Sequence, residues 1–236
     1  MILYLHGFTS GPQSVKARAL GERMAARGLA ADFICPQLPA SPAAAITLAE
    51  RLINQRKLGA DETTALQGGR AEGTQLCRPR IPASRAGLLA VADADTVNHG
   101  KNDAQITLVG SSLGGFYATV LAEKFNLNAV LINPAVINQL PMDDFIGTHR
   151  WLYTGEPFEF TAQHIAELRA LELPRPSQPD RFWLMLEEGD ETLDYQKAVA
   201  YYAGARQTVL AGGDHSFTRW NDYLDEIIDW SAAPAA

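Results

Sequence analysis

The sequence lacks the features that would indicate a metal site, a membrane span or a nucleic-acid partner. Its two cysteines, Cys35 and Cys77, stand in no Cys/His spacing typical of metal ligands, so we interpret them as incidental thiols and expect no metal and no cofactor. No run of about 18 apolar residues is present, and we expect no membrane span. The net charge of −7 argues against nucleic acid as a partner. The N-terminal residues carry neither a basic region nor a cleavage site, so we expect a cytoplasmic protein.

Apolar runs alternate with helical patterns from the start of the chain. Residues 2–5 and 32–38 have strand character, and residues 12–27 and 43–55 have helical spacing. Such alternation predicts a parallel sheet with right-handed crossovers. The length of 236 residues is sufficient for one α/β domain with a large core, and we expect a single domain over residues 1–236.

The alternation stops at residues 56–104. This stretch is rich in glycine, alanine, threonine and arginine, contains Pro79 and Pro82, and offers only residues 83–91 as a short helix. A connection of this length is unusual within a compact domain. We interpret it as a mobile insertion and keep a substrate lid as the alternative, because few large apolar residues could cover an acyl group.

The most informative stretch is 105–123, where an apolar run is followed by glycines and then by a helical pattern. Within it Gly110-Ser111-Ser112-Leu113-Gly114 fits G-x-S-x-G, the pattern of a nucleophile elbow. The glycines leave room for a serine in a strained conformation at a helix N-terminus, where an anion is stabilised. By itself the pattern also fits a glycine-rich connection with capping serines.

Two further polar turns follow predicted strands. Residues 182–186 form an apolar run that leads to Asp190, and residues 207–210 lead to His215. Both turns, like the serine elbow, come just past the carboxyl end of a strand, so all three should meet at one edge of a sheet. We therefore predict that Ser112 is the nucleophile, His215 the general base and Asp190 the acid that orients His215.

Asp194 and Asp214 compete with Asp190 for the acidic role. Asp194 fits the N-cap of the next helix, and Asp214 adjoins His215 and should point away from it.

Backbone and pocket groups complete the predicted site. The N–H groups of Phe8 and Leu113 are candidates for an oxyanion hole. His6 and Gly7, at the end of the first strand, are pocket candidates, with His6 as a loop histidine bonded to backbone rather than an acid or base. Asn133 and Pro134 follow the strand at 129–132 and should also line the pocket.

Residues 139–173 contain several aromatic side chains between two strands. Trp151, Tyr153, Phe158 and Phe160 suggest a small helical cap over the pocket, although aromatic residues at helical spacing often form plain core.

With these residues in place, the sequence resembles the YqiA-type esterase family (UPF0227) of the α/β-hydrolase superfamily. The matching stretches cover nearly the whole chain and include Leu3-Tyr4-Leu5-His6-Gly7-Phe8, residues 36–39, 108–117, 130–136 and 189–195, and Gly212-Gly213-Asp214-His215-Ser216-Phe217. The resemblance implies one α/β-hydrolase domain with a mostly parallel sheet of about six strands, flanked by helices and lacking the first two antiparallel strands. It also implies a serine esterase for short to medium acyl esters, with its triad at Ser112, Asp190 and His215. Residues 56–104 have little counterpart in this family.

Two other functions fit the same residues. An acyl-CoA thioesterase would use the same triad, and an α/β-hydrolase-like protein could bind a ligand without turnover. The expected partner is a small acyl ester or thioester, and the sequence carries no indication of the oligomeric state.

Overall fold

A parallel sheet of six strands forms the centre of the molecule. The structure is a computed structural model that describes residues 1–68 and 105–232. The strands are β1 (Ile2–Leu5), β2 (Phe33–Ile34), β3 (Thr107–Ser111), β4 (Asn128–Ile132), β7 (Phe182–Glu187) and β8 (Arg206–Leu210), and they pair in the order β2-β1-β3-β4-β7-β8. All five pairings are parallel, which confirms the predicted sheet. The second strand, expected at 32–38, is shorter than predicted.

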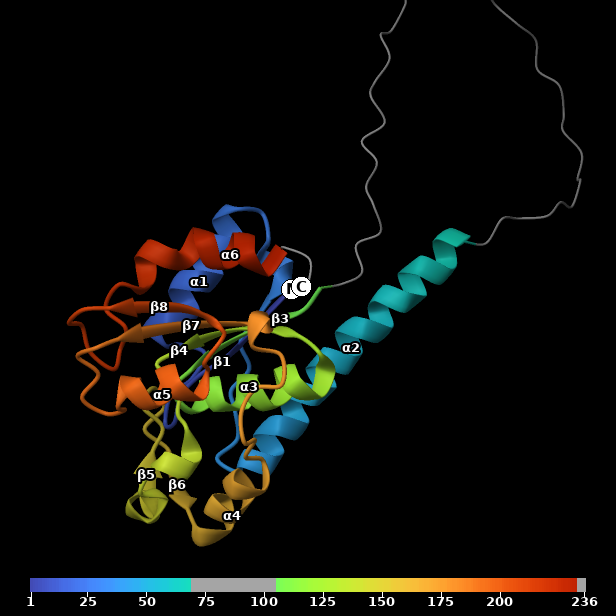
Figure 1. Cartoon of the computed structure of the whole chain (residues 1–236). Coiled ribbons are helices and arrows are strands. Elements are labelled where there is room, and N and C mark those ends of the chain that lie inside the picture. Colours follow the sequence, from blue (N-terminus) through green and yellow to red (C-terminus); the bar gives the residue numbers. More distant parts are fainter. Residues whose placement is uncertain (69–104, 233–236) are drawn as a thin grey trace, which may run out of the picture.

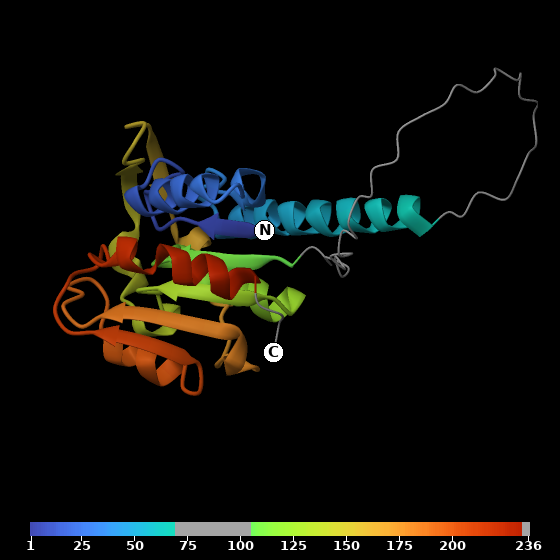
Figure 2. The same ribbon diagram turned by 90° about the horizontal axis from the view of Figure 1, so that it is seen from above.

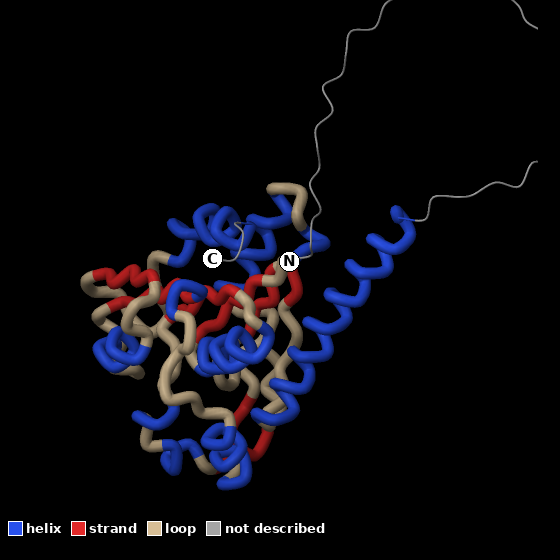
Figure 3. The backbone as a smooth tube through the Cα atoms, turned by 45° about the vertical axis from the view of Figure 1, so that its right-hand side comes forward, coloured by secondary structure: helices blue, strands red, loops and turns tan. Residues whose placement is uncertain are grey.

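Helices cover both faces of this sheet (Figure 1, Figure 3). They are α1 (Val15–Ala26), α2 (Pro42–Gly68), α3 (Leu113–Phe125), α4 (Ala162–Ala170), α5 (Tyr195–Tyr201) and α6 (Leu224–Ala232). Short 3-10 helices lie at Ala30–Asp32, Ile137–Gln139, Met142–Phe145, Pro179–Arg181 and Trp220–Tyr223.

The strand side chains divide the apolar core into two layers. In β1, Ile2 and Tyr4 pack with α1 and α6, whereas Leu3 and Leu5 pack on the opposite face with α2, α3 and α4. This alternation is what a pleated strand covered on both sides requires. The carboxyl ends of the strands meet at one edge, where the connecting loops gather (Figure 2).

Helix α2 is much longer than predicted. We expected it to end near residue 55, but it continues to Gly68 and projects beyond the sheet (Figure 1, Figure 2). Residues 56–68 contain no proline and many residues with good helix propensity, so the helix can continue. Our interpretation of 56–104 as one insertion without structure was therefore wrong for its first part. The helix suggested at 83–91 lies outside the described residues.

The segment 139–173 is only partly helical. It contains α4 and a 3-10 helix, but also an antiparallel pair of strands, β5 (Gly147–Arg150) and β6 (Pro157–Phe160), which we did not predict. Phe158 and Phe160 are two positions apart, with Glu159 between them on the more exposed side. A period of two is typical of a strand, and our emphasis on helical spacing missed it.

Candidate active site

Ser112 lies in a sharp turn between β3 and α3. Its backbone has φ 55° and ψ −121°, a conformation that costs a non-glycine residue energy. A Cβ atom at Gly114 would overlap the carbonyl of Leu5, and one at Gly110 would overlap the carbonyl of Gly114. Backbone bonds hold the turn, since Ser112 N–H donates to the Ile132 carbonyl at 3.0 Å. The two glycines of the motif are thus required by close packing.

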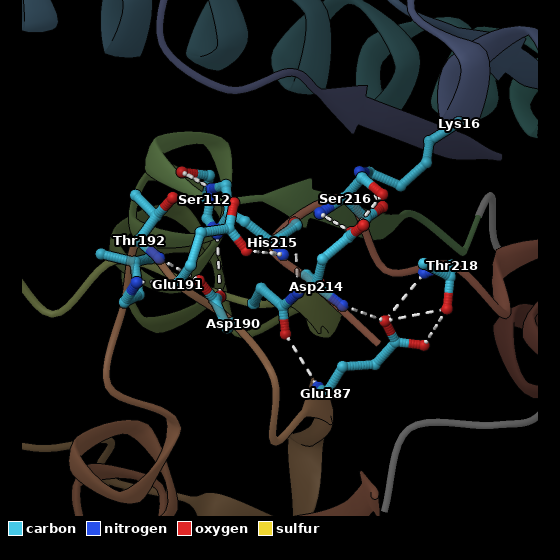
Figure 4. Close-up of polar contacts among 12 residues, drawn as sticks. Lys16, Ser112, Glu187, Asp190, Glu191, Thr192, Asp214, His215, Ser216 and Thr218 are labelled. Atoms are coloured by element: carbon cyan, nitrogen blue, oxygen red, sulfur yellow. Dashed lines mark hydrogen bonds and ion pairs between the residues drawn. The ribbon is translucent and has the colours of Figure 1, made fainter. Parts of the chain in front are cut away.

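Three side chains from separate loops form a hydrogen-bonded line (Figure 4). His215 Nε2 is 3.1 Å from Ser112 Oγ, and His215 Nδ1 is 2.8 Å from Asp190 Oδ2. The other Asp190 oxygen accepts hydrogen bonds from the N–H groups of Thr192 at 2.9 Å and Leu193 at 2.8 Å. The Asp190 side chain is 1% exposed and that of His215 24%. Because the carboxylate only accepts, Nδ1 carries the proton and Nε2 is free to accept one from Ser112.

The two alternative acids lie away from the His215 ring. Asp194 Oδ1 accepts from Gln196 N–H at 3.0 Å and caps α5, as its position in the sequence suggested. Asp214 Oδ1 accepts from Ser216 N–H at 2.8 Å within its own turn. The structure thus brings Asp190, and neither alternative, against His215.

Two backbone N–H groups near Ser112 are available to an anion. Within the described part of the chain, the N–H groups of Phe8 and Leu113 donate no hydrogen bond. Leu113 is the first residue of α3, where the helix dipole favours negative charge. The ring of Phe8 contacts four rings of the segment that contains β5 and β6, Phe145, His149, Phe158 and Phe160, with centroid distances of 4.8 to 6.0 Å. These contacts fix the loop that carries its N–H.

His6 is bonded on both ring nitrogens. Its Nε2 accepts from Leu38 N–H and its Nδ1 donates to the Gly7 carbonyl, both at 3.0 Å. The side chain is buried, and burial lowers its pKa. These bonds give His6 a structural role in joining the first loop to the turn at residues 36–39.

A pocket of about 680 Å³ opens beside Ser112 and His215. His6 and Gly7 line it, as does the Leu113 side chain. The other two candidates, Asn133 and Pro134, are not among its lining residues. Pro134 instead packs against Gly115 at the start of α3.

The Asn133 side chain is hydrogen-bonded to the backbone of the loop that carries His215. Its side-chain amide donates to the carbonyls of Asp214 at 3.2 Å and His215 at 3.1 Å, and its oxygen accepts from Glu187 N–H at 3.1 Å. Its φ of 41° is unusual for a non-glycine residue. Asn133 therefore contacts the backbone of the site rather than the pocket.

Glu187 is a residue that our sequence interpretation missed. It ends β7, is fully buried, and accepts hydrogen bonds from Asp214 N–H, Thr218 N–H, the Thr218 hydroxyl and Arg219 Nε, each at 2.9 Å. Burial alone would raise its pKa, but the bonds from Thr218, Arg219 and Asp214 outweigh burial and lower the pKa to about 2. The available signal in the sequence was a glutamate at the end of an apolar strand. The hydrogen bonds to Glu187 fix residues 214–219, the loop that carries His215.

Neither metal ligands nor a membrane span are evident in the described ranges. Across residues 1–68 and 105–232, no group of three or more His, Cys, Asp and Glu side chains could hold a metal ion. The helices in these ranges are also too short or too polar to cross a membrane. Cys35 is a half-buried free thiol whose pKa burial raises to about 12.

Solved structures share this architecture at low sequence identity. The chain is similar to Est1E from Butyrivibrio proteoclasticus, with 12% identity and a TM-score of 0.58 over 99% of this chain and 88% of that chain. It is similar to an esterase domain from a Rhodothermus marinus protein, with 14% identity and a TM-score of 0.55 over 98% and 85% of the two chains. It is also similar to the α/β hydrolase domain-containing protein 10 from mouse, with 17% identity and a TM-score of 0.52 over 97% and 89%.

At such identities the likeness establishes the fold alone, which is that of the α/β-hydrolases. The sequence itself matches the group described as "Uncharacterised protein family (UPF0227)" over residues 1–68 and 82–232. Our expectation that residues 56–104 have little counterpart in this family was therefore wrong, except for residues 69–81, which lie outside the match. The match covers most of the chain, and the protein therefore belongs to the uncharacterised protein family UPF0227.

Proposed function

We propose that this protein is a serine esterase that hydrolyses short to medium acyl esters through an acyl-enzyme intermediate. The observation that carries the proposal is the hydrogen-bonded line from Ser112 through His215 to Asp190. Ser112 and His215 line a largely apolar pocket, and Asp190 lies behind His215. A strained serine at a helix N-terminus, next to a histidine with a buried carboxylate behind it, is suited to nucleophilic attack on a carbonyl.

In the first half of the reaction, Ser112 Oγ attacks the ester carbonyl carbon while His215 Nε2 takes the hydroxyl proton. The tetrahedral intermediate carries a negative oxygen, which the N–H groups of Phe8 and Leu113 would bind. Each such donor contributes roughly 3 kcal/mol to transition-state stabilisation in serine hydrolases. Collapse of the intermediate breaks the bond to the alcohol, and His215 returns its proton to the leaving oxygen.

In the second half, water attacks the acyl group on Ser112. His215 accepts a proton from this water, and the second tetrahedral intermediate releases the carboxylic acid as the proton returns to Ser112 Oγ. Asp190 stays ionised throughout and stabilises the imidazolium that forms twice in the cycle.

The lining of the pocket supports an apolar acyl group. Residues after β4 contribute a set of apolar side chains to it: Ala135, Ile137, Leu140, Met142, Phe145, Phe160 and Leu168. A volume of about 680 Å³ falls within the range of small-molecule sites. Both features suit an acyl chain of short to medium length.

The test is an assay of the purified protein on p-nitrophenyl esters of increasing acyl length, beside the Ser112→Ala variant. We expect hydrolysis by the parent, a maximum at short to medium chains, and a loss of at least about 10⁴-fold in kcat for the variant. Equal rates for the two proteins would overturn the proposal. Acyl-CoA substrates in the same assay test the thioesterase alternative, which faster turnover of thioesters than of matched oxygen esters would favour.

A further inference from the structure

The pocket has a second wall, apart from the apolar residues after β4 that we assign to the acyl group. This wall comes from the loop before α1, the start of α1 and the loop after β8, on the face of the sheet that α1 and α6 cover. Its polar lining residues are Ser10, Ser14, Lys16, Ser216, Thr218 and Asn221. Among the described residues that line the pocket, Lys16 is the only lysine or arginine. The pocket is thus apolar on one side, and the rest of its lining includes one cation, Lys16, and one carboxylate, Glu191, which accepts a hydrogen bond from His215 N–H.

Lys16 reaches from α1 to the loop of the candidate base (Figure 4). Its Nζ donates to the Ser216 carbonyl at 2.6 Å, and its own carbonyl accepts from Trp220 Nε1 at 3.0 Å. An ammonium group has three donors, so this one bond leaves capacity for another acceptor. Across the described residues, Lys16 forms no ion pair.

The carboxylates near Lys16 are bonded to other groups. Asp214 accepts from Ser216 N–H, and Glu191 Oε2 accepts from His215 N–H at 3.1 Å. The carboxylates of Glu187 and Asp190 accept the hydrogen bonds described above. Burial lowers the pKa of Lys16, whereas Asp214, Glu187 and Asp190 act in the opposite direction. The Lys16 ammonium is partly desolvated and its one hydrogen-bond partner, the Ser216 carbonyl, is neutral, so an anion bound beside it would stabilise its charge.

The position of Lys16 also indicates which part of a substrate it would meet. His215 Nε2 must reach the leaving oxygen in order to protonate it, so the alcohol portion lies on the His215 side of Ser112. Lys16 contacts Ser216, the residue that follows His215. The acyl group, in contrast, would lie against the segment after β4.

We propose that Lys16 binds an anionic group, a carboxylate or a phosphate, on the alcohol portion of the ester. The inference rests on the proposed esterase function and names the class of substrate for it: an apolar acyl group joined to an alcohol that carries a negative charge.

The test compares two esters that differ by one carboxylate on the leaving group, p-nitrophenyl butanoate and its analogue with a carboxylate on the phenyl ring. We expect the parent to have at least a tenfold higher kcat/KM for the carboxylated ester. Lys16→Met, which keeps most of the length of the side chain and removes the charge, should abolish this preference, and Lys16→Arg should keep it. Lys124→Met, at the far end of α3 in an ion pair with Glu50, is the matched control and should keep the parent's ratio.

Inhibition separates the two anions and needs no variant. Benzoate and phenyl phosphate should each inhibit the parent at least tenfold more strongly than phenol, and the stronger of the two identifies the preferred anion. A parent without preference in either experiment, or a Lys16→Met variant that loses the same factor on both esters, would overturn the role of Lys16. If the parent hydrolyses neither ester, the proposed esterase function fails as well, so the two failures are distinguishable.

Discussion

The two parts of the candidate active site, the edge of the sheet and the segment after β4, are held together by different interactions. At the edge formed by β3, β7 and β8, directional hydrogen bonds fix the side chains of Ser112, His215 and Asp190, and Glu187 and Asn133 fix the loop beneath them. In the segment after β4, the residues that line the pocket are held mainly by apolar and aromatic contacts around Phe8. Proton transfer requires fixed geometry, whereas an acyl chain requires apolar surface of the right shape. Changes at the edge should therefore alter kcat, and changes in the segment should alter selectivity.

Among the residues that support Ser112, the largest effect is expected at Asp190. Asp190→Asn keeps the size of the side chain but removes the charge that stabilises the imidazolium and sets the His215 tautomer, so we expect kcat to fall by about 10³ to 10⁴. Steady-state rates of the parent and the variant on p-nitrophenyl butanoate measure this fall in kcat. Asp194→Asn is the control, because asparagine also caps helices well and activity should stay within about twofold. A reversed order of the two variants would reject Asp190 as the acid.

Folding stability should depend on Glu187 in acid. Its pKa lies at about 2, below the usual value of 4.5, so its contribution is present above pH 4.5 and is lost as the pH falls toward 2. The lowering corresponds to about 3 kcal/mol at neutral pH. Urea unfolding of the parent and Glu187→Gln at neutral pH and at pH 3 should give a stability difference that shrinks in acid. A stability difference between the two proteins that does not change with pH would contradict the role of the Glu187 carboxylate in fixing this loop.

The same variant should slow the reaction while leaving substrate binding nearly intact. An amide at position 187 cannot accept all the bonds from Asp214, Thr218 and Arg219, so the loop of His215 should loosen. We expect kcat to fall by about 10- to 100-fold and KM to change by less than about threefold. Glu188→Gln alters the exposed neighbour and should behave like the parent. A change confined to KM would place Glu187 in substrate binding instead.

The smallest effect is a change in acyl preference from the apolar side of the pocket. Leu140 lines the pocket and is only partly buried, so Leu140→Phe should fill space without disrupting the core. We expect the ratio of kcat/KM for octanoyl over acetyl esters to fall about tenfold. Ile146→Phe, at a more exposed site outside the lining, should leave the ratio unchanged. If both variants changed the ratio equally, the segment would not define the acyl site.

The edge of the sheet and the segment after β4 also differ in how far the sequence predicts them. The sheet and the loops of Ser112, Asp190 and His215 could be predicted because apolar runs and glycine turns are local sequence patterns, and because parallel strands place their carboxyl ends at one edge. Glu187 was missed because its partners lie about 30 positions further along the chain, and only the fold brings them together. The strands β5 and β6 were missed because each is short and their pairing is not visible in either one alone. Lys16 was missed for the same reason, since Ser216 lies 200 residues away.

The most direct test of the central claim is covalent labelling. The folded parent and the Ser112→Ala variant would be incubated with a fluorophosphonate, and their intact masses measured. The account predicts one phosphonyl group on the parent, located on the peptide that contains Ser112, and none on the variant. An unlabelled parent, or equal labelling of both proteins, would contradict the proposal that Ser112 is an activated nucleophile.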